Sequence, residues 1–169
     1  MVINMNFKLN SQPIKLYKLL LEEYFALKID MGYVWGEPHQ SFEISKDDNC
    51  LFEFSINKNN ELCEAILITN TDYCIKNEDL QYQLLPQEGV IIVEKPKNLF
   101  AEKFEVVVFK NGLQITFSEN FPACAYKQGE FVVYLGDDGK ITALQVWNLN
   151  KEEREHLLLE LRYNKEGKS

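Results

Sequence analysis

The chain has 169 residues, of which 46% are hydrophobic and 26% charged, and its formal net charge at pH 7 is −8. This composition is typical of a globular protein, and the length favours a single domain, which we place at residues 1–165 with a frayed tail at 166–169. The acidic balance argues against nucleic acid or an anionic membrane as the main partner, because both carry dense negative charge.

The first predicted element is an amphipathic helix that begins after Ser11 and ends at Asp30-Met31-Gly32. Ser11 can cap it, and Pro13 suits the first turn, where a missing N–H costs no hydrogen bond. Apolar residues recur along it at helical spacing: Ile14, Tyr17, Leu21, Tyr24 and Phe25. We therefore expect this helix to pack on a sheet.

The loop after this helix, residues 32–40, carries Tyr33, Trp35, Glu37 and His39 between its glycines and proline. We place these four residues at the mouth of a possible pocket between the helix and the sheet, where a small molecule could bind. Glu37 and His39 are also a local pair that could transfer a proton. An enzyme of unrecognised type is therefore a further alternative.

Short strands with alternating apolar and polar residues account for most of the remaining chain. They are predicted at 42–45, 51–56, 62–69, 90–93, 104–109, 113–117, 131–135 and 141–147. Asn111-Gly112 predicts a type I′ hairpin turn, and a closing helix begins at Asn150, with Glu153 completing an approximate capping box. The predicted fold class is α+β: a single curved antiparallel β-sheet of meanders and hairpins, with an N-terminal helix packed on it and a C-terminal helix.

One predicted hairpin is similar in sequence pattern to a second hairpin later in the chain. Residues 54–62 resemble residues 133–141, about 79 positions further on, because each segment is a strand, a polar turn and a strand. Hairpins look alike for physical reasons, so the sequence leaves open whether the chain contains two copies of one unit.

Motifs that identify an enzyme or a cofactor site are missing from the sequence. It has no GxSxG nucleophile elbow, no GxGxxG dinucleotide loop and no HExxH zinc motif. Its two histidines have no metal-ligand neighbour at motif spacing, and its four cysteines form no CxxC pair. We expect a protein that is not an enzyme and that binds no cofactor and no metal. Since the sequence shows neither a secretory signal nor an apolar run of about 18 residues, we also expect a cytoplasmic location with reduced cysteines.

Negative charge is concentrated in the middle of the chain. Residues 61–94 hold seven acidic residues and one base, Lys76, so this segment carries most of the net charge. Aromatic residues interleaved with these acids would suit the capture of a basic protein, because the charges steer the encounter and the rings supply contact area. The candidate partner-binding residues are Asp72, Tyr73, Glu78, Asp79, Tyr82 and Glu88. The alternative is that the acids only keep the protein soluble.

The last third of the chain runs from the hairpin turn Gly136-Asp137-Asp138-Gly139-Lys140 into the acidic helix start Asn150-Lys151-Glu152-Glu153. This part resembles small bacterial α+β proteins that end in a DDG hairpin and an acidic helix. Among them are cytosolic immunity proteins of contact-dependent and other polymorphic toxin systems. The resemblance implies a non-enzymatic inhibitor that covers the active site of a cognate basic toxin, often a nuclease, and it gives no individual residue a role.

Overall fold

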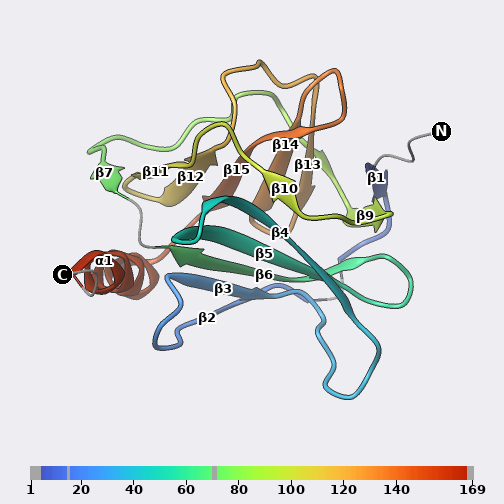
Figure 1. Cartoon of the computed structure of the whole chain (residues 1–169), viewed down its shortest axis with the longest axis horizontal. Coiled ribbons are helices and arrows are strands. Elements are labelled where there is room, and N and C mark those ends of the chain that lie inside the picture. The colour runs from blue at the N-terminus through green and yellow to red at the C-terminus, as the bar shows by residue number, and fades with distance from the viewer. Residues whose placement is uncertain (1–4, 15, 70–71, 167–169) are drawn as a thin grey trace.

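The computed structural model describes residues 5–14, 16–69 and 72–166, which form fifteen β-strands and one helix (Figure 1). The strands of the first half are β1 (Asn6–Asn10), β2 (Lys18–Leu20), β3 (Leu27–Asp30), β4 (Gln40–Asp47), β5 (Cys50–Ile56), β6 (Leu62–Thr69) and β7 (Tyr73–Ile75). They are followed by β8 (Gln87–Glu88), β9 (Val90–Glu94), β10 (Leu99–Phe100), β11 (Glu105–Val108), β12 (Gly112–Thr116), β13 (Cys124–Gln128), β14 (Phe131–Leu135), β15 (Ile141–Trp147) and the helix α1 (Lys151–Glu166).

These strands form three sheets rather than one. The first sheet has six strands in the order β10-β4-β5-β6-β3-β2, and the second has seven in the order β7-β11-β12-β15-β14-β13-β8. A small third sheet pairs β1 with β9. The single-sheet prediction and the α+β class are therefore wrong, because the described chain is mostly β with one C-terminal helix. Most neighbouring strands are antiparallel, as predicted, and the short edge strands β7, β8 and β10 pair in parallel.

The main hydrophobic core lies between the inner faces of the two large sheets. The ring of Phe131 in the second sheet lies 6.1 Å from the rings of Phe52 and Phe54 in the first, measured between centroids. All three side chains are fully buried. Buried and half-buried residues alternate along β4 and β5, which is the pattern of strands with one face on a core.

The predicted N-terminal helix is wrong. Its residues form β2, β3 and the turns around them, and Tyr24 has a φ of 74°, which no right-handed helix contains. Leu16 and Leu21, which the helix would have buried, are 41% and 40% exposed, whereas Leu27 and Ile29 are buried on β3. Pairing of β3 with β2 and β6 satisfies the backbone and buries these β3 side chains, and this tertiary gain outweighs a weak local helix preference.

The closing helix agrees with its prediction. The Asn150 side chain accepts a hydrogen bond from the Glu153 backbone N–H at 2.8 Å, and the Glu153 carboxylate accepts one from the Asn150 N–H at 2.9 Å. This reciprocal pair is a capping box. The helix then packs at one end of the sheets, where His156 Nε2 hydrogen-bonds the Phe25 carbonyl at 3.1 Å (Figure 1).

The two large sheets are built from the same arrangement of five strands. In the first sheet it is β4-β5-β6-β3-β2, and in the second it is β13-β14-β15-β12-β11. Each copy begins with a hairpin, and each continues into a three-stranded meander whose last strand pairs with the second strand of that hairpin. The chain therefore contains one five-stranded unit twice.

Irregularities in the strands repeat between the two units. The pairing register shifts at residues 55–56 of β5 and again at residues 134–135 of β14. A side chain of the next strand donates to the carbonyl at each bulge, from Cys63 Sγ at 3.3 Å in the first unit and from Thr142 Oγ1 at 3.4 Å in the second. Bulges are specific features of a strand pair, so their repetition supports a duplicated unit.

The turns after these bulges also match. In the turns 57–61 and 136–140, the first N–H donates to the last carbonyl, at 3.0 Å and 2.9 Å. The fourth residue of each turn has a positive φ, 63° at Asn60 and 77° at Gly139. The sequence similarity between residues 54–62 and 133–141 therefore falls on equivalent hairpins of the two units.

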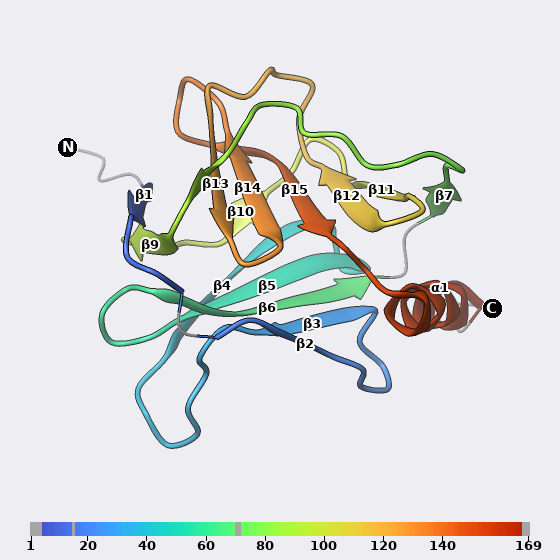
Figure 2. The same ribbon diagram turned by 180° about the vertical axis from the view of Figure 1, so that it is seen from behind.

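An irregular segment, residues 76–86, crosses the outer face of the second sheet from the β7 edge to the β8 edge, and we call it the strap (Figures 1 and 2). Its hydrogen bonds to the second sheet occur in chain order. The Glu78 carbonyl accepts from the Lys110 N–H, and the Leu80 N–H donates to Asn111 Oδ1. Further along, the Gln81 carbonyl accepts from Gln145 Nε2, and the Gln83 N–H donates to Tyr134 Oη. The strap therefore closes a second, smaller hydrophobic cluster on that face.

The strap also explains why position 112 is a glycine, which we predicted from the sequence to serve a type I′ turn. The hairpin around Asn111-Gly112 is present, but neither residue has a positive φ, so the turn is not type I′. A Cβ at position 112 would instead lie 2.6 Å from Leu80 Cδ2 and 2.6 Å from the Val146 carbonyl oxygen. Gly112 is needed for the close approach of the strap to the sheet.

Candidate functional site

The residues predicted to bind a partner do not gather in one patch. Tyr73 lies on β7 and Glu88 on β8, at opposite edges of the second sheet. Six strand spacings of about 4.8 Å separate those edges, or about 29 Å. Asp72, Glu78 and Asp79 are exposed near the β7 end of this path.

Tyr82, at the centre of the strap, packs inward and is part of the fold. Its ring lies 4.1 Å from the ring of Trp147, and its hydroxyl accepts a hydrogen bond from Lys127 Nζ at 3.0 Å. Lys127 Nζ also lies 3.8 Å from a carboxylate oxygen of Glu88. Tyr82 and Glu88 are therefore engaged with the second sheet of their own chain.

The four predicted pocket residues all lie on the β3–β4 connection, but only two of them meet. Tyr33 and His39 stack with ring centroids 3.9 Å apart, and His39 Nε2 is buried without a hydrogen-bond partner among the described residues. Trp35 is 92% exposed and Glu37 is also exposed. Within the described chain no hydrogen bond or ion pair joins Glu37 to His39, so the geometry offers no support for proton transfer between them.

Carboxylates instead gather on the outer face of the first sheet. Asp30, Glu43, Glu53 and Glu64, which we call the carboxylate face, come from the four adjacent strands β3, β4, β5 and β6. Glu43 is the cross-strand partner of Glu53, and Asp30 is that of Glu64. Like charges placed directly opposite one another destabilise a sheet. Asp30 also accepts hydrogen bonds from the backbone N–H groups of Gly32 and Tyr33, both at 3.0 Å, so the fold accounts for its carboxylate. The fold does not account for the placement of Glu43, Glu53 and Glu64.

Nearby positive charges compensate the carboxylates of this face only in part. Burial raises the pKa of Glu53, and the nearby carboxylate of Glu43 raises it further. Burial also raises the pKa of Glu64, where Lys28 opposes the shift and Glu53 and Asp30 add to it. Within the described residues, no hydrogen bond or ion pair reaches the side chains of Glu43, Glu53 or Glu64.

Two bases lie on the same face: Lys18 on β2 is the cross-strand partner of Asp30, and Lys28 has a partner of its own. Lys28 on β3 forms an ion pair with Glu22 at 3.1 Å, and its ammonium lies 5.6 Å from the centroid of the Phe25 ring. Since it is committed to Glu22, Lys28 compensates the neighbouring carboxylates only in part. A cation from outside the chain would relieve the remaining repulsion.

Replacing Glu53 with Gln should stabilise the protein at neutral pH by about 0.5 kcal/mol, because the substitution removes one like-charged cross-strand pair. A carboxyl whose pKa is raised on folding holds its proton more tightly in the folded chain than in the unfolded one. The loss of stability caused by ionised Glu53 is therefore absent below the ordinary carboxyl pKa, and it grows as the pH rises through the raised pKa of the folded state. Urea unfolding of both proteins across this pH range should show the stability gap widening towards neutral pH.

The matched control is Glu78→Gln, which removes the same charge from an exposed site on the strap. It should change the free energy of unfolding by less than about 0.5 kcal/mol at every pH. An equal pH dependence in the Glu53 and Glu78 variants would contradict the repulsion assigned to the carboxylate face.

Each five-stranded unit also has an exposed aromatic side chain at the same position of an equivalent loop. Met31 and Phe117 follow β3 and β12, and each donates its N–H to the neighbouring strand at 2.9 Å. Trp35 and Phe121 stand four residues further on, and both are 92% exposed. Trp35 belongs to the connection that follows Asp30 at the end of β3, so this large apolar side chain is close in sequence to one member of the carboxylate face.

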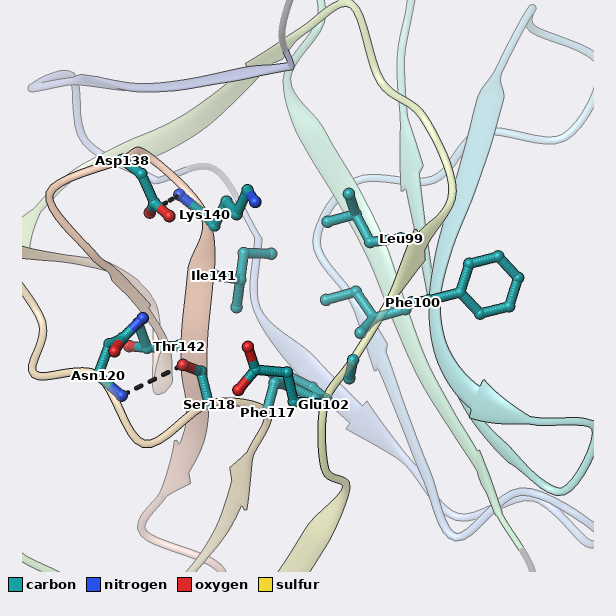
Figure 3. Close-up of a pocket in the computed structure, with 12 residues that line it drawn as sticks. Leu99, Phe100, Glu102, Phe117, Ser118, Asn120, Asp138, Lys140, Ile141 and Thr142 are labelled. Carbon is teal, nitrogen blue, oxygen red and sulfur yellow. Dashed lines mark hydrogen bonds between the residues drawn. The ribbon is translucent and has the colours of Figure 1, made fainter.

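A cavity of about 160 Å³ lies between β10 of the first sheet and the ends of β12 and β15 of the second (Figure 3). Leu99 and Ile141 supply apolar walls, Lys140 and Glu102 supply charge, and the exposed ring of Phe100 turns away from it. This volume is below the roughly 300 Å³ of cavities that bind drug-sized ligands, whereas two more open hollows elsewhere on the described chain measure about 500 and 520 Å³. The predicted pocket between an N-terminal helix and the sheet is wrong because that helix does not form.

Other features bear on alternative functions. The helix of the structure is not long and apolar enough to cross a membrane, considering the described residues. The same residues contain no group of three or more His, Cys, Asp or Glu side chains arranged to hold a metal ion. The four cysteines are free, and burial raises the pKa of the Cys63 thiol to about 12.

No known protein family matches this sequence, and no curated protein matches it either. The case for a function therefore comes from the charge and geometry of the chain itself.

Proposed function

We propose that this protein is a binding module for a basic partner protein and that the carboxylate face is its contact surface. The observation that supports this most directly is the register of the first sheet, which places Glu43 opposite Glu53 and Asp30 opposite Glu64. Lysine or arginine side chains of a partner would turn this repulsion into attraction. The exposed ring of Trp35, on the connection that follows Asp30, would add apolar contact area, as interface tryptophans do.

We further propose that the partner is a toxin and that the module neutralises it in the cytoplasm by covering its active site. This role is the one implied by the resemblance of the closing segment to immunity proteins. A nuclease is the partner class that fits best, because the site of an enzyme that binds nucleic acid is positively charged. An acidic inhibitor would reach such a site quickly, since complementary charge accelerates association.

Two triple variants with the same change in charge test the surface. The face triple is Glu43→Gln, Glu53→Gln, Glu64→Gln. The strap triple is Glu78→Gln and Asp79→Asn on the strap together with Glu88→Gln just beyond it on β8. The probe is fluorescein-labelled oligolysine, titrated at low and at moderate salt. Three exposed ion pairs of about 0.5 kcal/mol each predict that the face triple weakens binding about tenfold. Binding of the wild type should also weaken as salt rises, because screening shortens the range of exposed charges.

The strap triple distinguishes a local surface from a general effect of net charge. It should weaken oligolysine binding by less than about threefold, which corresponds to about 0.6 kcal/mol. Equal losses in both triples would mean that only net charge matters. A loss confined to the strap triple would move the surface to the strap, and either result would overturn the proposal for the carboxylate face.

A further inference from the structure

The duplicated unit offers an internal example of how an outer sheet face is covered. In the second unit, the strap covers this face and contributes a series of hydrogen bonds to it. Within the described part of the chain, no segment makes a comparable series to the outer face of the first unit. Among the described residues, the same architectural surface is therefore crossed by a hydrogen-bonded segment in one copy and not in the other.

The strap crosses the strands almost at right angles. Leu80 bonds to the β11–β12 turn and Gln83 bonds to Tyr134 on β14, two strands beyond β12 in the sheet order. Three residues of extended chain span about 10 Å, and two strand spacings also span about 10 Å. An extended segment therefore advances about one strand for every one or two residues, and it presents successive groups to successive strands.

One pair of equivalent positions in the two units carries opposite charge. Lys127 on β13 stands opposite Val132, and Glu43 on β4 stands opposite Glu53, so the matching registers make Glu43 the counterpart of Lys127. In the second unit this base faces an acidic neighbour, because Lys127 Nζ lies 3.8 Å from a carboxylate oxygen of Glu88. In the first unit the acidic residue, Glu43, belongs to the sheet. A partner segment that covers this sheet would therefore have to provide the basic residue.

Apolar contact is available beside these charges. Trp147, which packs under the ring of Tyr82, has Ile68 as its counterpart on β6, and the adjacent outward residue of that strand is Ile66. A segment that crosses the first sheet would therefore meet carboxylates on β4 and β5 and the half-buried Ile68 on β6, whereas Ile66 is itself buried. This arrangement suits a chain in which basic residues flank an aromatic or aliphatic one.

We infer that the partner covers the first sheet with an extended basic segment that crosses its strands as the strap crosses those of the second sheet. This inference rests on the proposed function and specifies the conformation and the chemistry of the part that binds. The segment places lysine or arginine against Glu43, Glu53 and Glu64 and an apolar side chain against Ile68.

Two synthetic peptides with the same number of lysines and one tyrosine test the conformation. The first alternates lysine with threonine, which favours an extended chain, and the second places the lysines in an alanine-rich frame that forms a helix. Fluorescence anisotropy should show the extended peptide binding about tenfold more tightly, because a chain already in its bound form loses less entropy. Equal affinities, or tighter binding of the helical peptide, would overturn the extended mode and leave the proposed function in place.

Charge reversal at a single position tests the placement. Glu43→Lys gives the first unit the charge that Lys127 gives the second, and it should weaken binding of the extended peptide about tenfold. Glu78→Lys, the matched reversal on the strap, should weaken it less than about threefold. Glu43→Gln provides the same test without a buried cation if the Lys variant fails to fold. Absence of binding by both peptides would overturn the inference and the proposed function together, and equal sensitivity at Glu43 and Glu78 would overturn the placement.

Discussion

Replacing Gln145 with Leu should destabilise the protein by about 3–5 kcal/mol, which is a large effect for one substitution of similar volume. Gln145 is fully buried beneath the strap. Its amide makes four hydrogen bonds: Nε2 donates to Gln81 O at 2.8 Å and to Gln114 Oε1 at 2.8 Å, and Oε1 accepts from Tyr134 Oη at 2.7 Å and from Trp147 Nε1 at 2.9 Å. Leu would leave these partners unsatisfied.

The cost arises because a buried polar group without a partner loses its hydration and gains nothing in return. Each such group costs about 1–3 kcal/mol. The hydroxyl of the fully buried Tyr134 would lose its acceptor and keep only the bond it accepts from Gln83 N, and the Gln81 carbonyl on the strap would lose its donor. Urea unfolding should give the loss in the free energy of unfolding. Hydrogen exchange should also show faster opening of residues 76–86, because the strap loses the bond from Gln145 to its centre.

Trp147→Phe is the graded control for Gln145→Leu. It removes one hydrogen bond to the same amide and keeps most of the aromatic surface under Tyr82, so it should cost about 1–2 kcal/mol. If the Gln145 variant costs no more than the Trp147 variant, the buried amide is not what fixes the strap to the second sheet.

Strands in the middle of the large sheets could be predicted from alternation, as in β5, or from short runs rich in β-branched and aromatic residues beside a polar turn, as in β14 and β15, which are buried on both faces. The ranges predicted for β5, β6, β14 and β15 agree with the structure. The edge strands β7, β8 and β10 are two or three residues long, and each pairs in parallel with a strand far away in the sequence. A segment this short has no periodicity to detect, so only the tertiary fold defines it.

The carboxylate face was partly visible in the sequence and was missed for a definite reason. Glu43 lies between Phe42 and Ile44, and Glu53 lies between Phe52 and Phe54, so strand alternation alone points both acids outward. Counting charge along the chain favoured residues 61–94 instead, because it treats sequence neighbours as spatial neighbours. What brings the acids together is the order and register of four strands, and no local pattern specifies either.

The order of the strands was open for a related physical reason. The β4–β5, β5–β6, β11–β12 and β14–β15 hairpins were predicted, but the β2–β3 hairpin and the strand β13 were not. Each meander closes on the second strand of a hairpin that lies earlier in the chain. In the first unit that hairpin falls in the stretch with helical spacing. The sequence similarity between residues 54–62 and 133–141 therefore covered only the two equivalent hairpins. The other strands of the first unit were not matched to strands of the second in the prediction.

Replacing Phe131 with Ala should destabilise the protein by about 3–5 kcal/mol, because it opens a cavity where the two large sheets meet. Phe131 is fully buried in the second sheet, and its ring contacts those of Phe52 and Phe54 in the first. If the sheets share one core, unfolding followed by hydrogen exchange in β5 and in β14 should give one transition and the same loss of stability in both.

A double-mutant cycle makes the test specific to contact between the sheets. Phe131→Ala combined with Phe54→Ala should lose less stability than the sum of the single variants, with a coupling of about 1 kcal/mol from the shared cavity and the ring pair. Phe104, which packs on Phe117 at 5.3 Å, is the matched control and should combine with Phe54→Ala additively to within about 0.5 kcal/mol. Independent transitions for β5 and β14 would instead show two units that fold separately, and the carboxylate face would then belong to a domain with its own stability.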